Sequence, residues 1–265
     1  MGAYQVGMLR ALLDRGVVPD LVVGTSVGAL NGAAVAADPT PGVVDRLESE
    51  WAGVVKSGVF TGSLFTGAVT LFRTRTSVHS NKPLRDLIDR VLPVRTFEEL
   101  ALPFQCVAAN IERAEEHWFQ TGPLGQAILA SSAIPGLLPA VEIDGEHFID
   151  GGIVNSIPVG RAVELGAREI YVLHVGRIER GVTPPANPWQ VAMVAFEIAR
   201  RHRFARDMAT LPRGVTAHVL PTGERRPPRY DDLSQLRYRD FSQVARRIRQ
   251  AYRATLGYLD EIGSA

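Results

Sequence analysis

The sequence contains few of the residues that cross-link a fold or anchor it in a membrane. Its 265 residues include one cysteine, Cys106, which excludes a disulfide framework and a zinc site built from several cysteines. Lysine occurs only as Lys56 and Lys82, and the formal net charge is +1. No apolar run reaches the ~18 residues that span a bilayer, and no secretory signal opens the chain. We therefore expect a cytoplasmic protein, at most peripherally associated with a membrane.

The composition is that of an ordinary globular protein, with 46% hydrophobic and 22% charged residues. We expect a single domain over residues 1–265, with a core over about 1–176 and a mostly helical extension over about 184–265. From Arg200 onward the chain has 14 arginines against 7 acidic residues. This excess fits a solvated helix face, or attraction to anionic lipid headgroups. No nucleic-acid-binding motif accompanies it, so we expect no nucleic-acid partner.

Strand and helix patterns alternate along the chain, which predicts an α/β fold around a largely parallel sheet. Short β-branched and apolar runs predict strands at residues 21–23, 103–109, 170–175 and 217–220. Helical spacing predicts helices at residues 7–13, 27–37, 124–131, 158–165, 188–208 and 241–262.

A candidate nucleophile lies between the first of these strands and the second helix. Gly24-Thr25-Ser26-Val27-Gly28 matches the pattern G-x-S-x-G, in which a serine sits on a strained strand-to-helix turn. The N-terminus of the following helix offers free N–H groups and a partial positive charge, which suit an anion forming beside the serine. The alternative is a glycine-rich turn in which Ser26 only caps the helix.

A serine hydroxyl needs a base to accept its proton. A Ser–Asp–His triad would take its base from four histidines, at positions 147, 174, 202 and 218. Only 25 residues precede Ser26, which leaves little room for the strands that precede the nucleophile in α/β-hydrolases. The other candidate is Asp150, which ends a predicted strand and precedes Gly151 and Gly152. Taken alone, this Asp-Gly-Gly sequence is equally typical of an ordinary turn.

Three segments together resemble the patatin-like phospholipases. They are GAYQVGML at residues 2–9, GTSVGALNGA at 24–33 and SSAIPGLLPAVEIDGEHFIDGGIVNSIPV at 131–159. The resemblance runs from about residue 2 to 176, and its third segment is more distinctive than either short motif.

This resemblance implies a three-layer α/β/α sandwich with a mostly parallel central sheet and a Ser–Asp dyad without histidine. Ser26 would be the nucleophile and Asp150 the general base, with Gly151 and Gly152 giving room at the turn. The implied activity is hydrolysis of fatty-acyl esters in lipids through an acyl-enzyme, at a membrane or micelle surface. The implied mechanism needs no metal and no cofactor.

The resemblance also implies an oxyanion hole that is incomplete in this sequence. Gly24 and Gly28 would shape the elbow, and the N–H of Val27 would contribute to the hole. Family members carry a loop G-G-G-x-[RK]-G after a first strand, of which only Gly2 matches here, with Met1 at the basic position. We expect an upstream segment to supply the strand and loop; the alternative is a weakened or inactive member.

Two other functions share this fold. A non-catalytic scaffold that binds lipid or protein would have lost the oxyanion loop, and an acyltransferase would pass the acyl group to an acceptor other than water. Residues 59–72 are apolar and interrupted by glycine, which fits a lid or lipid-docking surface, or equally a loop packed on the core.

Overall fold

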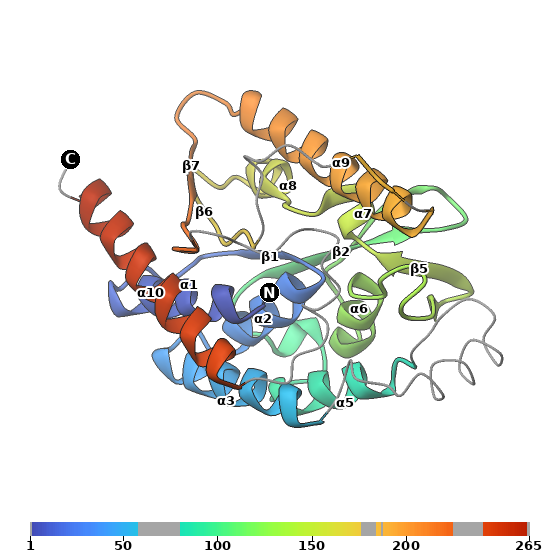
Figure 1. The fold of residues 1–265 in the computed structure, drawn as a ribbon, viewed down its shortest axis with the longest axis horizontal. Coiled ribbons are helices and arrows are strands. Elements are labelled where there is room, and N and C mark those ends of the chain that lie inside the picture. Colours follow the sequence, from blue (N-terminus) through green and yellow to red (C-terminus); the bar gives the residue numbers. More distant parts are fainter. Residues whose placement is uncertain (1, 58–79, 176–183, 187, 225–240, 264–265) are drawn as a thin grey trace.

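A five-stranded sheet lies at the centre of the fold, with a separate two-stranded sheet beside it (Figure 1). The computed structural model describes residues 2–57, 80–175, 184–186, 188–224 and 241–263. The strands are β1 (Val22–Thr25), β2 (Phe104–Asn110), β3 (Glu115–Phe119), β4 (Val141–Ile143), β5 (Glu146–Asp150), β6 (Glu169–Val172) and β7 (Thr216–Val219). The helices are α1 (Gly2–Asp14), α2 (Val27–Ala37), α3 (Pro41–Ser57), α5 (Lys82–Val91), the 3₁₀ turn η1 (Phe97–Glu99), α6 (Leu124–Ser131), α7 (Gly152–Asn155), α8 (Val159–Glu164), α9 (Pro188–Ala209) and α10 (Phe241–Gly263).

Strand β2 organises the central sheet because it pairs with three other strands. It runs parallel to β1 over residues 104–107 and antiparallel to β5 over residues 108–110. Strand β3 pairs with residues 106–110 of β2 and therefore occupies one edge of that strand. Strands β1 and β5 thus share the opposite edge. These two strands consequently run toward each other and end side by side, Thr25 opposite Val107 and Asp150 opposite Ala108.

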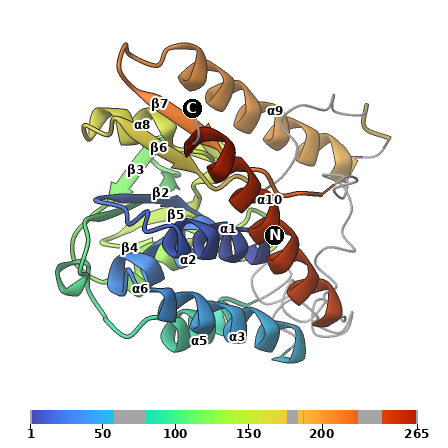
Figure 2. The same cartoon turned by 90° about the vertical axis from the view of Figure 1, so that its left-hand side faces the viewer.

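The expected α/β fold, with helices on both faces of a central sheet, is confirmed. In Figure 2, α2, α3, α5 and α6 lie below the sheet, and α8 and α9 lie above it. The central sheet is mixed in its strand directions, because β1 and β2 are parallel whereas the pairs β2–β3, β2–β5 and β4–β5 are antiparallel. The strands of the separate pair β6–β7 are parallel. The antiparallel β4–β5 hairpin turns through Asp144 and Gly145, which both have positive φ.

Small residues let α2 lie close to the sheet. Ala29, Ala33 and Ala36 are fully buried, and a Cβ on Gly32 would lie 2.9 Å from Val22 Cγ1. The helix ends at Asp38, which precedes Pro39. The close packing fixes the first turn of α2 relative to β1, and Ser26 lies between the two elements.

The first and last described helices pack against each other. A Cβ on Gly7 of α1 would lie 2.2 Å from the backbone oxygen of Ile248 in α10, so the two helix backbones are in direct contact. The hydroxyl of Tyr252 donates to Asp14 Oδ2 at 2.9 Å, and Arg15 forms an ion pair with Asp260. Met1 and residues 59–72, which the sequence analysis singled out, lie outside the described residues.

Candidate active site

Ser26 occupies a strained turn between β1 and α2. Its φ of 56° and ψ of −122° lie in a region that L-residues other than glycine rarely adopt. Gly24 is sterically required, because a Cβ there would lie 2.5 Å from the backbone oxygen of Gly28. Gly28 has more room than the motif suggests, since a Cβ there would meet only Gln5 Nε2 at 3.5 Å. The turn has the geometry of a nucleophile elbow.

The hydroxyl of Ser26 donates a hydrogen bond to Asp150. The distance from Ser26 Oγ to Asp150 Oδ2 is 2.6 Å, which is typical of a hydroxyl that donates to a carboxylate. Asp150 is 2% exposed and ends β5 beside the end of β1. The structure thus brings together the two residues that the sequence analysis paired, although 124 positions separate them.

Two glycines make room for the carboxyl group and its turn. The N–H of Gly152 donates to Asp150 Oδ1 at 2.7 Å, so each carboxyl oxygen has one donor. A Cβ on Gly151 would lie 2.2 Å from the backbone oxygen of Val107. A Cβ on Gly152 would lie 2.9 Å from both Asp150 Oδ1 and the ring of Phe196 in α9. Neither position can hold a larger residue without displacing the backbone or the carboxyl group.

Burial changes the proton affinity of this carboxyl group. Loss of solvation raises the pKa of Asp150 from 3.8 to about 6, although the hydrogen bonds from Ser26 and Gly152 act in the opposite direction. A carboxylate with a pKa near 6 is a stronger base than a free aspartate and is still mostly ionised at neutral pH. The environment therefore suits proton abstraction from the serine that it contacts.

The part of the chain that contains both Ser26 and Asp150 matches a known protein family. Residues 1–163 match the family model described as patatin-like phospholipase. The chain belongs to the patatin-like phospholipase family.

Similar proteins carry related names. The chain is 32% identical over 182 residues to the patatin-like phospholipase domain-containing protein ZK370.4 of Caenorhabditis elegans, covering 67% of this chain and 13% of that protein. It is 28% identical over 178 residues to the lysophospholipase nte1 of Aspergillus terreus, covering 67% and 11%. It is also similar to the crystal structure of VipD from Legionella pneumophila, with 14% identity and a TM-score of 0.45, covering 98% of this chain and 65% of that chain. The match thus spans only 11 to 13% of the two curated relatives.

Ser131 is a residue of the site that sequence reasoning did not assign. Its Oγ accepts the backbone N–H of Ser26 at 2.9 Å, and its own carbonyl accepts the N–H of Gly151 at 3.3 Å. Ala133 adds a third link, because its carbonyl accepts the N–H of Asp150 at 2.9 Å. The fully buried Ser131 therefore positions both halves of the site in this patatin-like protein. The distinctive segment at 131–159 begins with this residue, and that was the only signal in the sequence.

The side chain of Thr25 forms a second bridge between the two halves. Its hydroxyl donates to the backbone carbonyl of Asn155 at 2.8 Å, in the short helix α7 that follows the Asp-Gly-Gly turn. The N–H of Asn155 in turn donates to the carbonyl of Gly151 at 2.8 Å. These contacts fix the residue before the nucleophile to the turn that follows the base.

The residues expected at the oxyanion hole lie next to the elbow. The N–H of Ser26 is already bonded to Ser131. The next N–H along the elbow is that of Val27, the first residue of α2. Gly2 lies beside it, since a Cβ on Gly2 would be 2.7 Å from Val27 Cγ2. The carbonyl of Gly2 accepts from Asn31 Nδ2 at 3.3 Å, which ties the start of α1 to α2.

Three of the four histidines of the alternative triad have partners other than Ser26. His147 pairs with Glu112 at 2.7 Å, and His218 lies 3.0 Å from the hydroxyl of Tyr258. His174 is buried and lies 3.0 Å from Arg200 Nη1. Burial, with a further contribution from Arg200, lowers the pKa of His174 to about 3, so it stays neutral.

The described residues include neither a candidate metal site nor a candidate membrane span. They contain no group of three or more histidine, cysteine, aspartate or glutamate residues that could hold a metal ion. The described helices also include none that is long and apolar enough to cross a bilayer.

Proposed function

We propose that this protein hydrolyses fatty-acyl ester bonds of lipids, with Ser26 as the nucleophile and Asp150 as the general base. The single observation that carries this proposal is the 2.6 Å hydrogen bond from the Ser26 hydroxyl to a buried carboxylate. The strained backbone of Ser26 gives independent support. Residues in such unfavourable backbone conformations cluster at functional sites, where the surrounding structure maintains them.

The first half of the reaction forms an acyl-enzyme. As Ser26 Oγ attacks the ester carbonyl carbon, its proton passes to Asp150 Oδ2 and the carbonyl oxygen becomes an oxyanion. Collapse of this tetrahedral intermediate breaks the ester C–O bond, and the leaving alkoxide takes the proton from Asp150. The products are an alcohol, such as a lysolipid, and an acyl group on Ser26.

The second half releases the acyl group. Asp150 accepts a proton from a water molecule as its oxygen attacks the acyl carbon, and a second oxyanion forms. When this intermediate collapses, Ser26 leaves and regains the proton from Asp150, while the fatty acid departs. The dyad returns to its starting state without a metal or a cofactor.

The oxyanion needs N–H donors at the elbow. We assign one donor to Val27, since the positive end of α2 lies there and the N–H of Ser26 is bonded to Ser131. Loss of one such donor typically lowers turnover by about 10²–10³. A glycine-rich segment placed before Gly2 would add donors beside Val27, because Gly2 contacts that residue.

The proposed substrate class comes from the family. Its members are described as patatin-like phospholipases, and one relative is named a lysophospholipase. Such substrates reside in membranes or micelles, so we propose that the protein works at a lipid surface as a peripheral enzyme. A non-catalytic scaffold is the competing function, and the following experiment separates the two.

The test is labelling with a fluorophosphonate, which phosphonylates activated serines, followed by mapping of the adduct by mass spectrometry. We expect an adduct on Ser26 that disappears in Ser26→Ala and Asp150→Ala. Ser80→Ala and Asp20→Ala are matched controls, since both residues are exposed and lie outside the two motifs. Both controls should label like the wild type, and thermal melts should show that all variants are folded.

Each outcome has a distinct meaning. Labelling that persists in Ser26→Ala would overturn the assignment of the nucleophile. No labelling of this chain or of a version extended upstream in its gene would overturn the hydrolase proposal and favour the scaffold. Labelling of the extended version alone would support the dyad and show that additional residues complete the oxyanion hole.

A further inference from the structure

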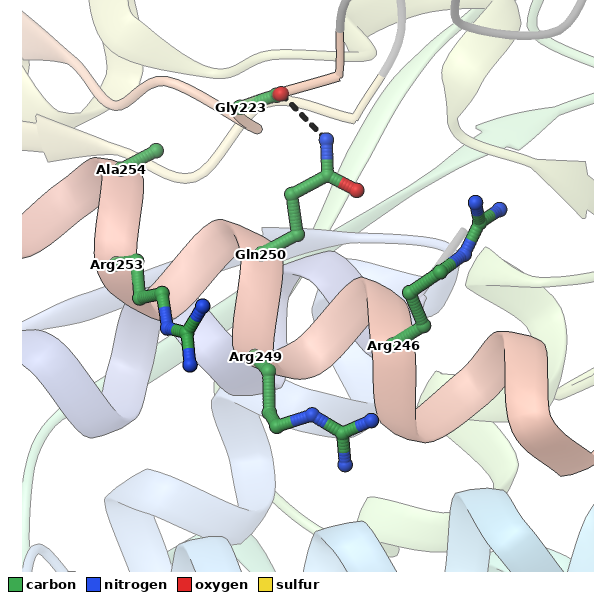
Figure 3. Close-up of a pocket in the computed structure, with 6 residues that line it drawn as sticks. All are labelled: Gly223, Arg246, Arg249, Gln250, Arg253 and Ala254. Atoms are coloured by element: carbon green, nitrogen blue, oxygen red, sulfur yellow. Dashed lines mark hydrogen bonds between the residues drawn. The ribbon is translucent and has the colours of Figure 1, made fainter.

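Helix α10 carries three exposed arginines on one face. Arg246, Arg249 and Arg253 are spaced by three and four residues, so their Cα atoms fall within about 60° around the helix axis. In Figure 3, Arg249 and Arg253 point to one side of the helix, and the side chain of Arg246 bends to the other side, where Gln250 lies. We call these three residues the α10 arginine stripe.

Within the described residues, the stripe has no acidic partner. Elsewhere the described arginines commonly form ion pairs, as in Arg10 with Asp45 and Arg95 with Asp89. Arg246 donates instead to the neutral amide of Gln243 at 3.2 Å. Within the described part of the chain, the side chains of Arg249 and Arg253 have no ion pair or hydrogen bond. Three positive charges are therefore available to an external anion.

The stripe borders an open groove between α10 and the loop after β7. The groove is lined by Gly223, Arg246, Arg249, Gln250, Arg253 and Ala254 (Figure 3). The side-chain amide of Gln250 donates to the carbonyl of Gly223, which fixes the loop across the helix. Gly223 has a φ of 69°, and a Cβ there would lie 3.0 Å from Ala254 Cβ. The loop at Gly223 therefore lies close against helix α10 on one side of the groove.

The helix that carries the stripe is coupled to the candidate active site through α1. The backbones of α1 and α10 touch at Gly7, and the guanidinium of Arg247 lies 5.7 Å from the ring centre of Tyr4. The same helix α1 begins at Gly2, which contacts Val27 next to the nucleophile. An anion that binds the stripe would therefore orient the rigid unit that contains the elbow.

We propose that the α10 arginine stripe binds the phosphate groups of anionic phospholipids and docks the protein on a membrane surface. Guanidinium groups suit this role because they remain charged and bind phosphate oxygens with two parallel hydrogen bonds. The choice of a lipid surface over another polyanion rests on the proposed lipid-ester substrate, which would itself lie in that surface.

Helix α9 supports a lipid surface as the occupant. Val191 and Ile198 are 53% and 54% exposed and lie seven residues apart, on one face of the helix. The two acidic residues of this helix, Glu197 and Asp207, are buried instead. In Figure 2 the N-terminal ends of α9 and α10 lie on the same side of the molecule. Apolar side chains combined with basic ones are typical of surfaces that bind anionic membranes.

The test measures binding of the Ser26→Ala protein to vesicles, so that hydrolysis cannot change the lipid. The vesicles contain either phosphatidylcholine alone or phosphatidylcholine with phosphatidylserine, at low and at high salt. A triple variant Arg246→Gln, Arg249→Gln, Arg253→Gln is compared with a control triple variant Arg85→Gln, Arg168→Gln, Arg213→Gln. The control arginines are exposed too, and the same net charge is removed.

We expect the stripe variant to bind the phosphatidylserine vesicles on the order of 100-fold more weakly than its parent, about fivefold for each arginine. The control variant should stay within a fewfold of the parent, and salt should weaken binding of the parent. Equal losses in both triple variants would overturn the proposal, because they would show an effect of net charge alone.

Two further outcomes would also overturn it. The first is equal binding to both kinds of vesicle. The second is tight binding to a DNA duplex with no binding to vesicles, which would assign the stripe to nucleic acid. Fluorophosphonate labelling does not require vesicles, so failure of the docking proposal would leave the Ser26–Asp150 proposal standing. Vesicle binding is measured on the Ser26→Ala protein, so the two failures are distinguishable.

Discussion

Ser26 and Asp150 lie next to the ends of two strands that run toward each other along one edge of β2. Thr25 is opposite Val107 and Asp150 is opposite Ala108, so consecutive residues of a fully buried strand set the distance between the two side chains. A rigid central strand thereby holds the serine and the carboxylate within hydrogen-bond distance. Precise positioning of this kind is what a proton transfer between them requires.

Replacing Asp150 by asparagine is expected to stabilise the protein at neutral pH. The pKa of Asp150 is about 6 in the folded state and 3.8 without the fold, so the folded state binds its proton more tightly. The stability contributed by this group is present below the lower value and is lost as pH rises through the higher one. We expect the free energy of unfolding of Asp150→Asn to be close to that of wild type near pH 4. Near pH 8 it should be higher than that of wild type by up to about 3 kcal/mol. Chemical denaturation at both pH values checks this, and a less stable variant near pH 8 would contradict it.

The same pKa predicts how the reaction of Ser26 depends on pH. Only the ionised carboxylate accepts the serine proton, so the rate of fluorophosphonate labelling should be constant above about pH 7 and fall tenfold for each pH unit below about 6. Stopped labelling reactions from about pH 4.5 to 8 give this profile. A half-maximal rate near pH 4 would show that burial does not raise the pKa of Asp150, and a rate that is constant over the whole range would show that Asp150 is not the titrating base.

The two glycines that flank Ser26 should respond differently to alanine. Gly24→Ala places a Cβ 2.5 Å from the backbone oxygen of Gly28, so we expect a loss of at least about 2 kcal/mol and loss of labelling. Gly28→Ala places a Cβ in ordinary contact within helix α2, where alanine is favoured by up to about 1 kcal/mol. Thermal melts and labelling of both variants test this contrast, and equal damage from both would refute it.

Ser131 should affect reactivity although its side chain bonds to the backbone of Ser26 and not to the reacting oxygen. Ser131→Ala leaves the buried N–H of Ser26 without its acceptor, which should cost about 1–3 kcal/mol of stability. The elbow would also lose its link to the Asp150 turn, so kcat should fall while KM stays close to the parent value. Ser132→Ala is the control, since its side chain makes no hydrogen bond within the described residues. A change in KM alone would argue against a positioning role.

His174 is expected to govern stability in acid and not the chemistry. Its pKa is about 3 in the folded state, so the unfolded chain binds a proton more readily below about pH 6.5. The resulting stability is present above that pH and is lost as pH falls toward 3. His174→Gln should therefore label normally and lose less stability than wild type on acidification, by on the order of 2 kcal/mol near pH 5. Loss of labelling would revive the histidine-dependent triad.

Several elements were predicted correctly because the residues at their ends mark where they begin and end. The stretch of small residues in α2 follows the Ser26 turn and ends at Asp38-Pro39, so its predicted and observed limits agree at residues 27–37. Helix α6, predicted at residues 124–131, is another such case. The strands β3 and β4 were not predicted, because a partly exposed strand of three to five residues has little periodicity of its own. Their places come from their partners, because β3 pairs with β2 and β4 pairs with β5.

The candidate site was predictable only in part, because some of its contacts depend on the tertiary fold. Ser26 and Asp150 sit in short motifs, so their types and spacing could be read directly. The link through Ser131 depends on α6 ending beside the elbow, which only the tertiary fold determines. The outward position of Val191 and Ile198 is opposite to the usual placement of large apolar residues, so helical spacing could not reveal which face of α9 is exposed.

The contact between α1 and α10 has a consequence for the order in which the chain folds. Asp14 and Tyr252 are 238 residues apart, so the face of α1 that contains Gly7 stays uncovered until α10 has left the ribosome. Contacts at such separation slow folding and prolong the exposure of apolar surface during synthesis. Because α1 also contacts the elbow, the site matures only after the last helix docks. A ribosome stalled before residue 241 would therefore hold a chain whose Ser26 is already made but not yet in a finished site.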